Sequence, residues 1–311
     1  MTPPYPFLST RAPRTPQRLL DQARGLPRPR VALVNAGAAH PLAGVREAAQ
    51  AGLAEPVLIG DRPRIEAAAD EIGYDIAGLR LVHAPRAEAS TRAADLARAG
   101  EVDAIMKGQV HTSTFLKGLL PAAAGLRDRD TRCGHVFHIT APGSDRPLLM
   151  TDAALNVDPD VETRQACLSL AVQLSELLDV ERPRAALLAP TEDPIPSVAN
   201  TMESAAIATW ARDHLPDADV AGPMAMDLIL SREAARIKGY DSPVAGDADI
   251  ILTPNITTGN AIFKLMVLGM GCCAGGLVMG ARVPILLTSR SQAAPARLAS
   301  AALGMIVAAA G

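Results

Sequence analysis

The chain has few aromatic residues, little net charge and no long hydrophobic run. Phe, Trp and Tyr make up 3% of its 311 residues, so Ala, Leu, Val, Ile and Met must fill the core. The net charge of −3 gives no global attraction to nucleic acid or anionic membrane. Its apolar runs are too short or too broken by glycine to span a bilayer. We therefore expect no nucleic-acid or membrane partner.

Cysteines are also few, and their spacing matches neither a CxxC pair nor a zinc pattern. They are Cys133, Cys167, Cys272 and Cys273. Reduced, buried cysteines and no bound metal are the prediction. Residues 1–30, rich in Pro and Arg, contain no apolar core of signal-peptide length, which predicts a cytoplasmic location.

Short β-rich runs alternate with helix-like stretches through the first part of the chain. The predicted strands cover 30–36, 55–60, 79–84 and 102–108. The predicted helices between them cover 41–52, 63–72 and 87–99. This alternation with short connectors is typical of an α/β fold with a parallel sheet and crossover helices.

A second set of elements follows from residue 134. Its predicted strands cover 134–140, 147–155, 184–189 and 248–254, and its helices 161–178, 199–213 and 259–270. A strand at 283–288 and an apolar, buried helix at 292–309 end the chain. We expect this last pair to return to the first domain, because the opening array lacks a closing element. The predicted α/β domains are therefore 1–131 with 277–311, and 132–276.

Ser289-Arg290-Ser291 lies between the predicted strand of 283–288 and the final helix. The free N–H groups and positive dipole at the start of a helix attract phosphate. Arg290 adds a planar guanidinium suited to two phosphate oxygens. A Ser291 N-cap beside a surface arginine explains the same residues, and Pro295 fits it, so both interpretations stay open.

The stretch MKGQVHTSTFLKG (106–118) has the same form, with a strand, a glycine turn and a helix beginning near Thr112 or Ser113. Its polar, cationic side chains are Lys107, His111, Thr112 and Lys117. A capped helix with exposed lysines is the alternative. Two such sites at the carboxyl ends of strands favour a phosphate-bearing ligand, because open α/β sheets bind ligands there.

Other polar stretches favour structural roles. Asp247 and Asp249 lack further ligands at a fixed spacing, so turn chemistry is preferred to a metal site. Asp158 is predicted to cap the helix that follows it. The GMGCCAGG stretch (269–276) follows a predicted helix rather than a strand, so we interpret it as close helix packing or a turn. His135 and His138 face opposite sides of a strand, which disfavours a shared metal.

Taken together, these segments resemble the phosphate acetyltransferase and phosphate butyryltransferase family. The resemblance is carried by DAIMKGQVHTSTFLKGLL, PLLMTDAALNVDPD, EAARIKGYDSPVAGDADIILTPNITTGN and ARVPILLTSRSQ. It is closest to the acyltransferase half of bifunctional enoyl-CoA hydratase/phosphate acetyltransferase proteins. It implies reversible transfer of an acetyl to butyryl group between CoA and phosphate. It also implies an isocitrate dehydrogenase-like architecture with the active cleft between two domains, a homodimer, and no cofactor beyond the substrates acyl-CoA and phosphate.

The resemblance also implies roles for individual residues. Arg290 would hold phosphate, and Ser289 would donate a hydrogen bond to the acyl carbonyl. Lys117 would supply a second cation, and His111 is the candidate base. The remaining candidates for substrate binding are Lys107, Thr112, Ser291 and Asn260.

Acidic residues of the family pattern are missing here. The positions at which relatives carry acids hold Gln292, Asn255, Thr257 and Ala296. Two further hypotheses follow. One is a catalytically weakened homologue that binds CoA or acyl phosphate as a sensor or partner subunit. The other is a dehydrogenase of similar two-domain shape, for which the sequence offers neither a clustered Asp set nor a nicotinamide site.

Overall fold

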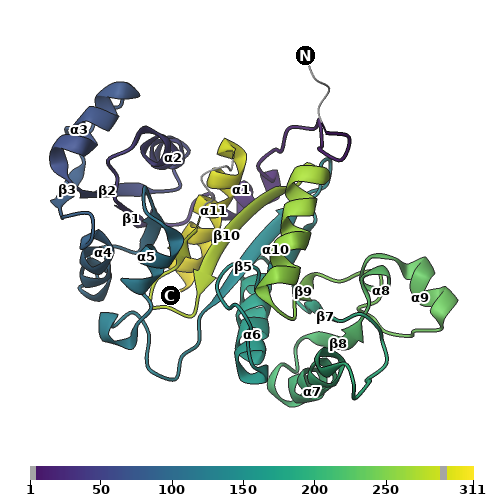
Figure 1. Ribbon diagram of the computed structural model, residues 1–311. Helices are drawn as coiled ribbons and strands as arrows, with labels where there is room; N and C mark the ends of the chain where they lie inside the picture. Colours follow the sequence, from purple (N-terminus) through teal and green to yellow (C-terminus); the bar gives the residue numbers. More distant parts are fainter. Residues whose placement is uncertain (1–4, 288–292) are drawn as a thin grey trace. The chain divides into compact units, whose positions relative to one another are not determined.

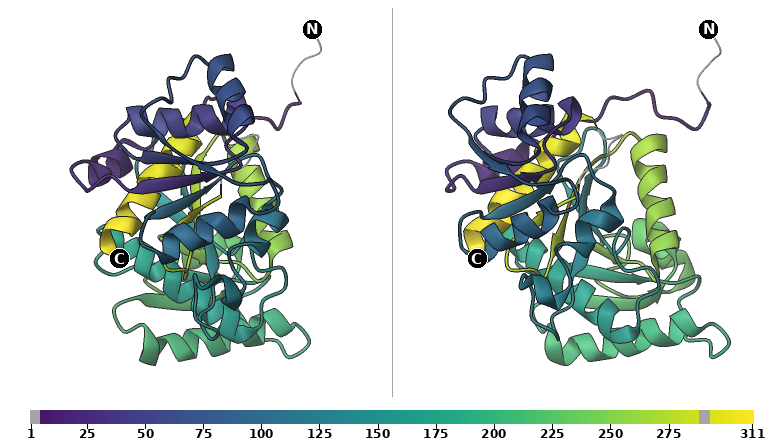
Figure 2. Two further views of the ribbon diagram at one scale, coloured as in Figure 1. Left: turned by 90° about the vertical axis from the view of Figure 1, so that its left-hand side faces the viewer. Right: turned by 60° about the vertical axis from the view of Figure 1, so that its left-hand side comes forward.

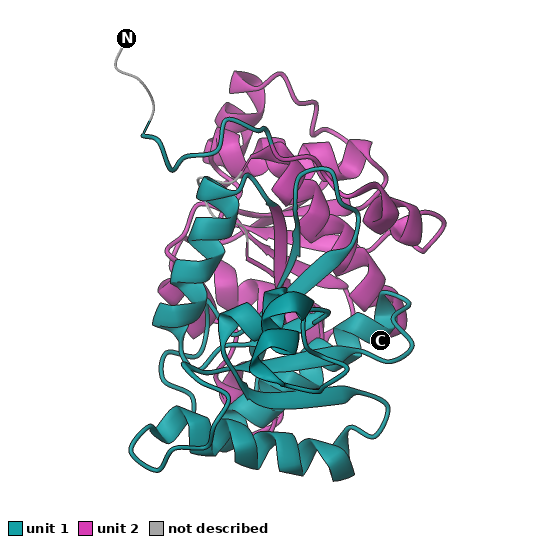
Figure 3. Ribbon diagram, turned by 90° about the vertical axis from the view of Figure 1, so that its right-hand side faces the viewer, with its two compact units in different colours: residues 1–12, 132–272 teal, residues 13–131, 273–311 magenta. Residues whose placement is uncertain are grey.

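The computed structural model describes residues 5–287 and 293–311, in which helices and strands alternate along most of the chain (Figure 1). The predicted α/β fold with mostly parallel strands is confirmed. The chain divides into two compact units, coloured separately in Figure 3. Unit 1 comprises Met1–Ala12 and Arg132–Cys272, and unit 2 comprises Pro13–Thr131 and Cys273–Gly311. The domain limits and the cleft between domains stay predictions.

Unit 2 contains the strand order β3-β2-β1-β4-β11-β10. Neighbours run parallel except β10 and β11, which are antiparallel. The strands are β1 (Arg30–Val34), β2 (Glu55–Gly60), β3 (Arg80–His83), β4 (Ala104–Lys107), β10 (Cys273–Met279) and β11 (Ile285–Leu286). The helices are α1 (Gln17–Ala23), α2 (Ala39–Gln50), α3 (Arg62–Glu71), α4 (Ala89–Arg98), α5 (Thr112–Lys117), the 3₁₀ helix Ala122–Ala124 and α11 (Ala294–Ala310).

Helix α11, yellow in Figure 2, packs on the strands of unit 2, and small residues make this contact close. A Cβ on Gly275 of β10 would lie 2.9 Å from the backbone of Ala299, so only glycine fits there. The Ser300 hydroxyl accepts a hydrogen bond from Gly276 N at 2.9 Å. An alanine-rich helix can therefore be buried here, and the predicted burial of the final helix is confirmed.

Unit 1 contains the strand order β5-β6-β9-β7-β8, with β5 and β6 antiparallel and the remaining neighbours parallel. Its strands are β5 (Gly134–Thr140), β6 (Pro147–Thr151), β7 (Arg184–Leu188), β8 (Asp219–Met224) and β9 (Ile250–Leu252). Its helices are α6 (Val161–Leu177), α7 (Ala199–His214), α8 (Met226–Leu230), α9 (Arg232–Lys238), α10 (Ile256–Lys264) and the π-helix Leu265–Gly269.

The two units share one spatial order of strands, although the antiparallel pair comes first along the chain in unit 1 and last in unit 2. In unit 1 an antiparallel β5–β6 pair continues through parallel β9, β7 and β8. In unit 2 an antiparallel β10–β11 pair continues through parallel β4, β1 and β2. A helix of 17 residues follows each pair, α6 in unit 1 and α11 in unit 2. The correspondence makes β6 the counterpart of β11, β9 of β4, and β7 of β1.

In both units an arginine and an aspartate form an ion pair where two central parallel strands begin. We call this pair the Arg–Asp bracket. In unit 2, Arg30 N, Nε and Nη2 donate to the Asp103 carboxylate at 2.8, 2.9 and 2.7 Å. In unit 1, Arg184 N, Nε and Nη2 donate to the Asp249 carboxylate at 3.0, 3.0 and 3.3 Å. Each bracket joins the first residue of one strand to the residue before its neighbour, which fixes the register of the pair.

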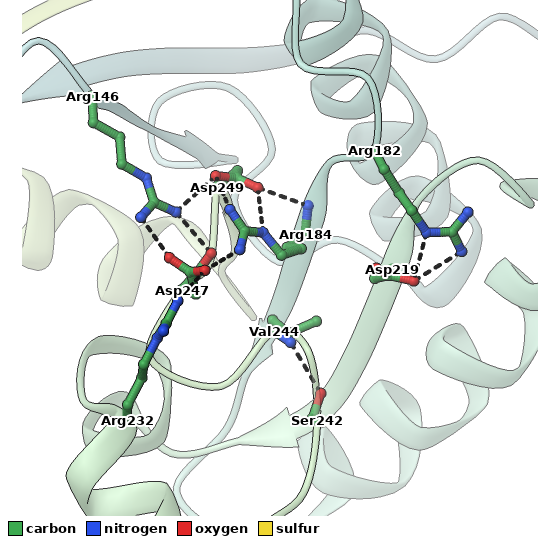
Figure 4. Close-up of polar contacts among 9 residues, drawn as sticks. All are labelled: Arg146, Arg182, Arg184, Asp219, Arg232, Ser242, Val244, Asp247 and Asp249. Atoms are coloured by element: carbon green, nitrogen blue, oxygen red, sulfur yellow. Dashed lines mark hydrogen bonds and ion pairs between the residues drawn. The ribbon is translucent and has the colours of Figure 1, made fainter.

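The unit 1 bracket belongs to a larger network (Figure 4). Asp247 accepts from Arg184, Arg146 and Arg232, and Arg146 also donates to Asp249 at 2.9 Å. Burial raises the pKa of Asp247, but these guanidinium groups outweigh it and lower the pKa to about 2. Asp247 does close the predicted turn, because its N–H donates to Val244 O at 3.1 Å. The sequence did not predict that both carboxylates also belong to an ion-pair network.

Several element predictions need correction. Residues 273–276 of the GMGCCAGG stretch begin β10, a strand buried along its length, so the predicted turn is wrong there. The alternative of close helix packing is confirmed at Gly275, which lies against the backbone of α11. Asp160, not Asp158, caps α6, because its carboxylate accepts from Thr163 N at 2.8 Å. Strand β8 went unpredicted, because DVAGPM has little β-prone content.

Candidate active site

The carboxyl ends of β1 and β4 mark the point where the strand order of unit 2 reverses. The chain runs outward from β1 to β2 and β3, and then returns to place β4 on the other side of β1. Ligands of open α/β sheets bind at such switch points. The segment Lys107–His111 begins there, where sequence reasoning had placed a phosphate-bearing ligand.

Lys107 ends β4 and is 7% exposed. Its Nζ donates to Val110 O at 3.3 Å and to Gly108 O at 3.5 Å. Carbonyl groups reduce the cost of burying an ammonium group, which is large without partners. The interpretation of Lys107 as an exposed lysine beside a capped helix is therefore wrong, whereas Lys117 is exposed at the end of α5.

The loop after β4 is attached to the loop after β1 by backbone hydrogen bonds. Gly108 N donates to Val34 O at 3.0 Å, and Gln109 N donates to Asn35 O at 3.1 Å. A Cβ on Gly108 would lie 2.2 Å from Val34 O, so any other residue would force the loops apart. The glycine turn noticed in the sequence is thus a close contact between two strand ends.

His111 and Thr112 lie at the start of α5, as predicted. His111 is the N-cap residue, its side chain makes no capping hydrogen bond, and both residues are exposed. Phe115, buried at 0% exposure, anchors α5 in the core. The fold therefore presents the side chains of His111 and Thr112 to solvent close in sequence to Lys107, and their catalytic and binding roles stay predictions.

Ser289, Arg290, Ser291 and Gln292 lie outside the described residues. The strand before them is β11, whose Leu286 pairs in parallel with Met106 of β4. The described part of the chain therefore ends, after β11, at the carboxyl end of the strand next to β4, the strand that carries Lys107. The observed strand, Ile285–Leu286, is shorter than the predicted 283–288.

Ala296, where relatives carry an acid, is buried in α11 at 6% exposure. Asn255, where another acid is missing, caps α10, because its Oδ1 accepts from Thr258 N at 3.0 Å. The missing acids are thus replaced by residues with structural roles at these two positions. The amide of Asn260 donates to Ala153 O at 3.3 Å, and its predicted contact with substrate is untested.

Asp152, after β6, is a buried carboxylate that sequence reasoning did not select. It is 3% exposed and accepts from the backbone N–H groups of Ala154, Leu155, Asn156 and His135 at 2.8 to 3.2 Å. The side chain of Asn156 also donates to it at 2.7 Å. In the sequence, Asp152 is visible only as an acidic residue close to the end of an apolar strand. That several N–H groups surround its carboxylate becomes apparent only in the fold.

The cysteines are reduced and buried, as predicted. Burial, with the nearby Asp152 carboxylate, raises the pKa of Cys167 to about 12, so this thiol cannot supply a thiolate near neutral pH. Among the described residues, no group of three or more His, Cys, Asp or Glu side chains is placed to hold a metal ion. No helix in the same part of the chain is long and apolar enough to cross a membrane.

Comparisons with known proteins identify the family. Residues 82–305 match a family model described as phosphate acetyl/butaryl transferase. The phosphate acetyltransferase of Rhizobium meliloti is 37% identical over 278 residues, which cover 87% of this chain and 88% of that relative. The phosphate butyryltransferase of Clostridium acetobutylicum is 34% identical over 269 residues, which cover 86% of this chain and 89% of that relative.

Solved structures agree on the fold. A branched-chain phosphotransacylase from Enterococcus faecalis superposes with a TM-score of 0.78 at 26% identity, covering 90% of this chain and 99% of that one. A 4-hydroxythreonine-4-phosphate dehydrogenase from Salmonella typhimurium reaches a TM-score of 0.59 at 13% identity, a likeness of fold alone. The family model and the relatives together show that the chain belongs to the phosphate acetyl/butyryltransferase family of transferases.

Proposed function

We propose that this protein is a cytoplasmic phosphate acyltransferase that moves a short acyl group, acetyl to butyryl, between CoA and inorganic phosphate. The observation that carries the proposal is similarity along most of the chain to relatives named for both acetyl and butyryl transfer. The position of Lys107 supports it, since a buried ammonium group at a switch point is suited to a phosphate-bearing substrate.

The reaction exchanges two bonds at one carbonyl carbon. A phosphate oxygen attacks the thioester carbonyl of acyl-CoA, the new C–O bond forms, and the C–S bond breaks to release CoA as thiolate, which then takes up a proton. The oxidation state of the carbon does not change, so the reaction needs no redox cofactor. The proposal also includes no metal. Positioning of the two substrates and stabilisation of the carbonyl oxyanion would supply most of the rate enhancement.

Roles follow for the predicted residues. Arg290 would hold the phosphate dianion through two N–H groups, and Ser289 would donate to the carbonyl oxygen as charge develops there. Lys107 and Lys117 would add positive charge, while Thr112, Ser291 and Asn260 would contact substrate. His111, exposed at the start of α5, would act as the base that receives a proton from phosphate.

A thiol-release assay tests the proposal. Purified protein is mixed with acetyl-, propionyl- or butyryl-CoA, and CoA release is measured with and without phosphate. We expect the native protein to release CoA only with phosphate, and the rate to fall by a factor of about 10³ in Arg290→Ala. A loss of this size is typical when a hydrogen-bond donor that stabilises the transition state is removed. Arg282→Ala is the matched control, because this exposed arginine stands before the same strand, β11, at its opposite end.

Two outcomes would contradict this function. Equal CoA release with and without phosphate would exclude phosphate as the acyl acceptor. Absence of turnover with all three chains, despite measurable CoA binding, would favour the sensor or partner-subunit hypothesis. The comparison of the three chains also reveals the acyl preference, which the sequence leaves open.

A homodimer is part of the proposal, and an exposed apolar surface of unit 1 supports it. Leu265, Leu268 and Met270 are 62%, 54% and 51% exposed, beside Phe7 at 72%. Ser9 N donates to Leu268 O at 2.7 Å, which holds the N-terminal segment against the π-helix. Light scattering tests whether Leu265→Glu dissociates the dimer. Leu230→Glu is the control, because Leu230 on α8 is also 62% exposed. A native protein that is monomeric in solution would contradict the proposed dimer.

A further inference from the structure

We propose that Asn35 is a positioning residue that holds the Lys107–His111 segment in place for catalysis, an inference that rests on the proposed function. Asn35 follows β1, is 7% exposed and has a left-handed backbone with φ of 56°. Sequence reasoning assigned it no role. Its contacts join the loops that follow β1, β3 and β4 at one edge of the sheet.

Three hydrogen bonds form a closed ring among these loops. Asn35 Nδ2 donates to Arg86 O at 3.1 Å, and Arg86 Nη2 donates to Gln109 O at 3.2 Å. Gln109 N closes the ring by donating to Asn35 O at 3.1 Å. Both backbone groups of Gln109 are thereby fixed by residues from other strands, two positions after Lys107.

The backbone of Asn35 explains why this residue type is present. A left-handed conformation costs most residues about 1–2 kcal/mol, whereas Asn and Gly adopt it readily. Glycine would keep the conformation but would lose the amide that donates to Arg86 O. Asparagine is thus the residue that satisfies both the backbone and the ring.

The ring acts on Lys107 through the loop carbonyls. Lys107 Nζ donates to Gly108 O and Val110 O, the carbonyls on either side of Gln109. Without the Asn35 amide, Arg86 loses a contact that holds it beside Gln109, so we expect the loop that carries both acceptors to shift, and Nζ with it. Displacements of about 1 Å in a catalytic site can reduce rates by a factor of about 100.

The test is a double-mutant cycle read as kcat/KM for phosphate-dependent CoA release. Asn35→Gly keeps the left-handed backbone and opens the ring by removing the bond from Asn35 Nδ2 to Arg86 O, and we expect a loss of about tenfold. In a Lys107→Met background the same change is expected to cost less than about twofold, because its effect passes through Lys107. Equal losses in both backgrounds would overturn the positioning role and leave Asn35 a purely structural residue.

A matched control separates backbone effects from the ring. Asp179, exposed after α6 in unit 1, is the other non-glycine residue with a positive φ among those described, at 60°. Asp179→Gly makes the same kind of backbone change away from the loops of unit 2, and we expect native kcat/KM. A loss equal to that of Asn35→Gly would contradict the proposal.

Hydrogen exchange provides a readout that does not depend on activity. In Asn35→Gly the amides of Gln109 and Val110 are expected to exchange about fivefold faster, while those of Ile105 and Met106 within β4 keep their native rates. Unchanged exchange at Gln109 would overturn the proposal even if the enzyme is active. Failure of the proposed function shows separately, as absence of phosphate-dependent turnover in the native protein.

Discussion

Units 1 and 2 share a spatial order of strands but stabilise corresponding positions differently. At the amino ends of their central strands both have an Arg–Asp bracket of nearly the same geometry. The side chains of Arg30 and Asp103 are 40% and 36% exposed, whereas those of Arg184 and Asp249 are 29% and 11% exposed. The same interaction thus lies near solvent in one unit and inside a charged network in the other (Figure 4). Geometry alone therefore does not determine what an ion pair contributes.

The carboxyl ends of the strands differ more strongly between the two units. In unit 1, the loop after β6 folds around the buried Asp152 carboxylate, which accepts hydrogen bonds from backbone N–H groups of the same loop. In unit 2, the corresponding chain after β11 contains Ser289 and Arg290, and the neighbouring β4 ends at Lys107. The Asp152 carboxylate occupies the N–H donors of its loop in unit 1, whereas β4 of unit 2 ends at the buried ammonium group of Lys107. The proposed function assigns phosphate to unit 2 for this reason.

Removal of the Asp152 carboxylate is the largest expected change. Asp152→Ala leaves several buried N–H groups without an acceptor, and we expect the free energy of unfolding to fall by about 4 kcal/mol. Urea denaturation with a constant m-value measures it. Asn35→Gly in unit 2, which loses one neutral hydrogen bond, is the comparison and is expected to cost about 1 kcal/mol. Equal losses would contradict the contrast between the two units.

The two brackets provide the second comparison. Asp249→Ala removes the bracket carboxylate from the partly buried Arg184 and leaves it with Asp247 alone, and we expect a loss of about 3 kcal/mol. Asp103→Ala breaks the more exposed pair and is expected to cost about 1 kcal/mol, after allowance for solvent screening. Chemical denaturation of both variants at low and high salt measures the difference. A larger loss for Asp103→Ala would show that the surrounding network does not increase the contribution of the bracket.

The smallest expected effect is a pH dependence specific to unit 1. Burial, only partly offset by the nearby Asp152 carboxylate, lowers the pKa of His135 to about 4. The unfolded chain binds this proton near pH 6.5, so the histidine destabilises the fold as pH falls below that value. We expect a loss of about 2 kcal/mol between pH 7 and pH 5. The histidines of unit 2, His40, His83 and His111, are exposed.

Denaturation of His135→Phe across this pH range checks the prediction. The replacement keeps a ring beside Phe137, whose centroid lies 4.3 Å from that of His135. The variant is expected to lose the pH-dependent part of the stability difference, whereas a matched change at exposed His214 retains it. An unchanged pH profile in His135→Phe would show that another group titrates.

Most helices and parallel strands of this protein follow from local patterns. RVALV and EPVLIG are apolar runs separated by amphipathic stretches, and they form β1 and β2 as expected. Prediction failed where packing outweighs propensity. The Cys-Ala-Gly-Gly start of β10 lacks a strand-like pattern, yet α11 packs so closely on Gly275 that a small residue is required. The ion-pair network of Asp247 and Asp249 was missed because its arginines are distant in sequence.

The sequence by itself determined the family, the α/β class and the polar segments at the strand ends, because these depend on neighbouring residues in fixed order. Tertiary structure alone decided that Lys107 is buried, that Asn35, Arg86 and Gln109 form a ring, and that Asp152 collects the N–H groups of its loop. Such contacts join residues from different strands or turns, and their strength depends on burial. Burial is a property of the packed fold, so no pattern of adjacent residues could have revealed it.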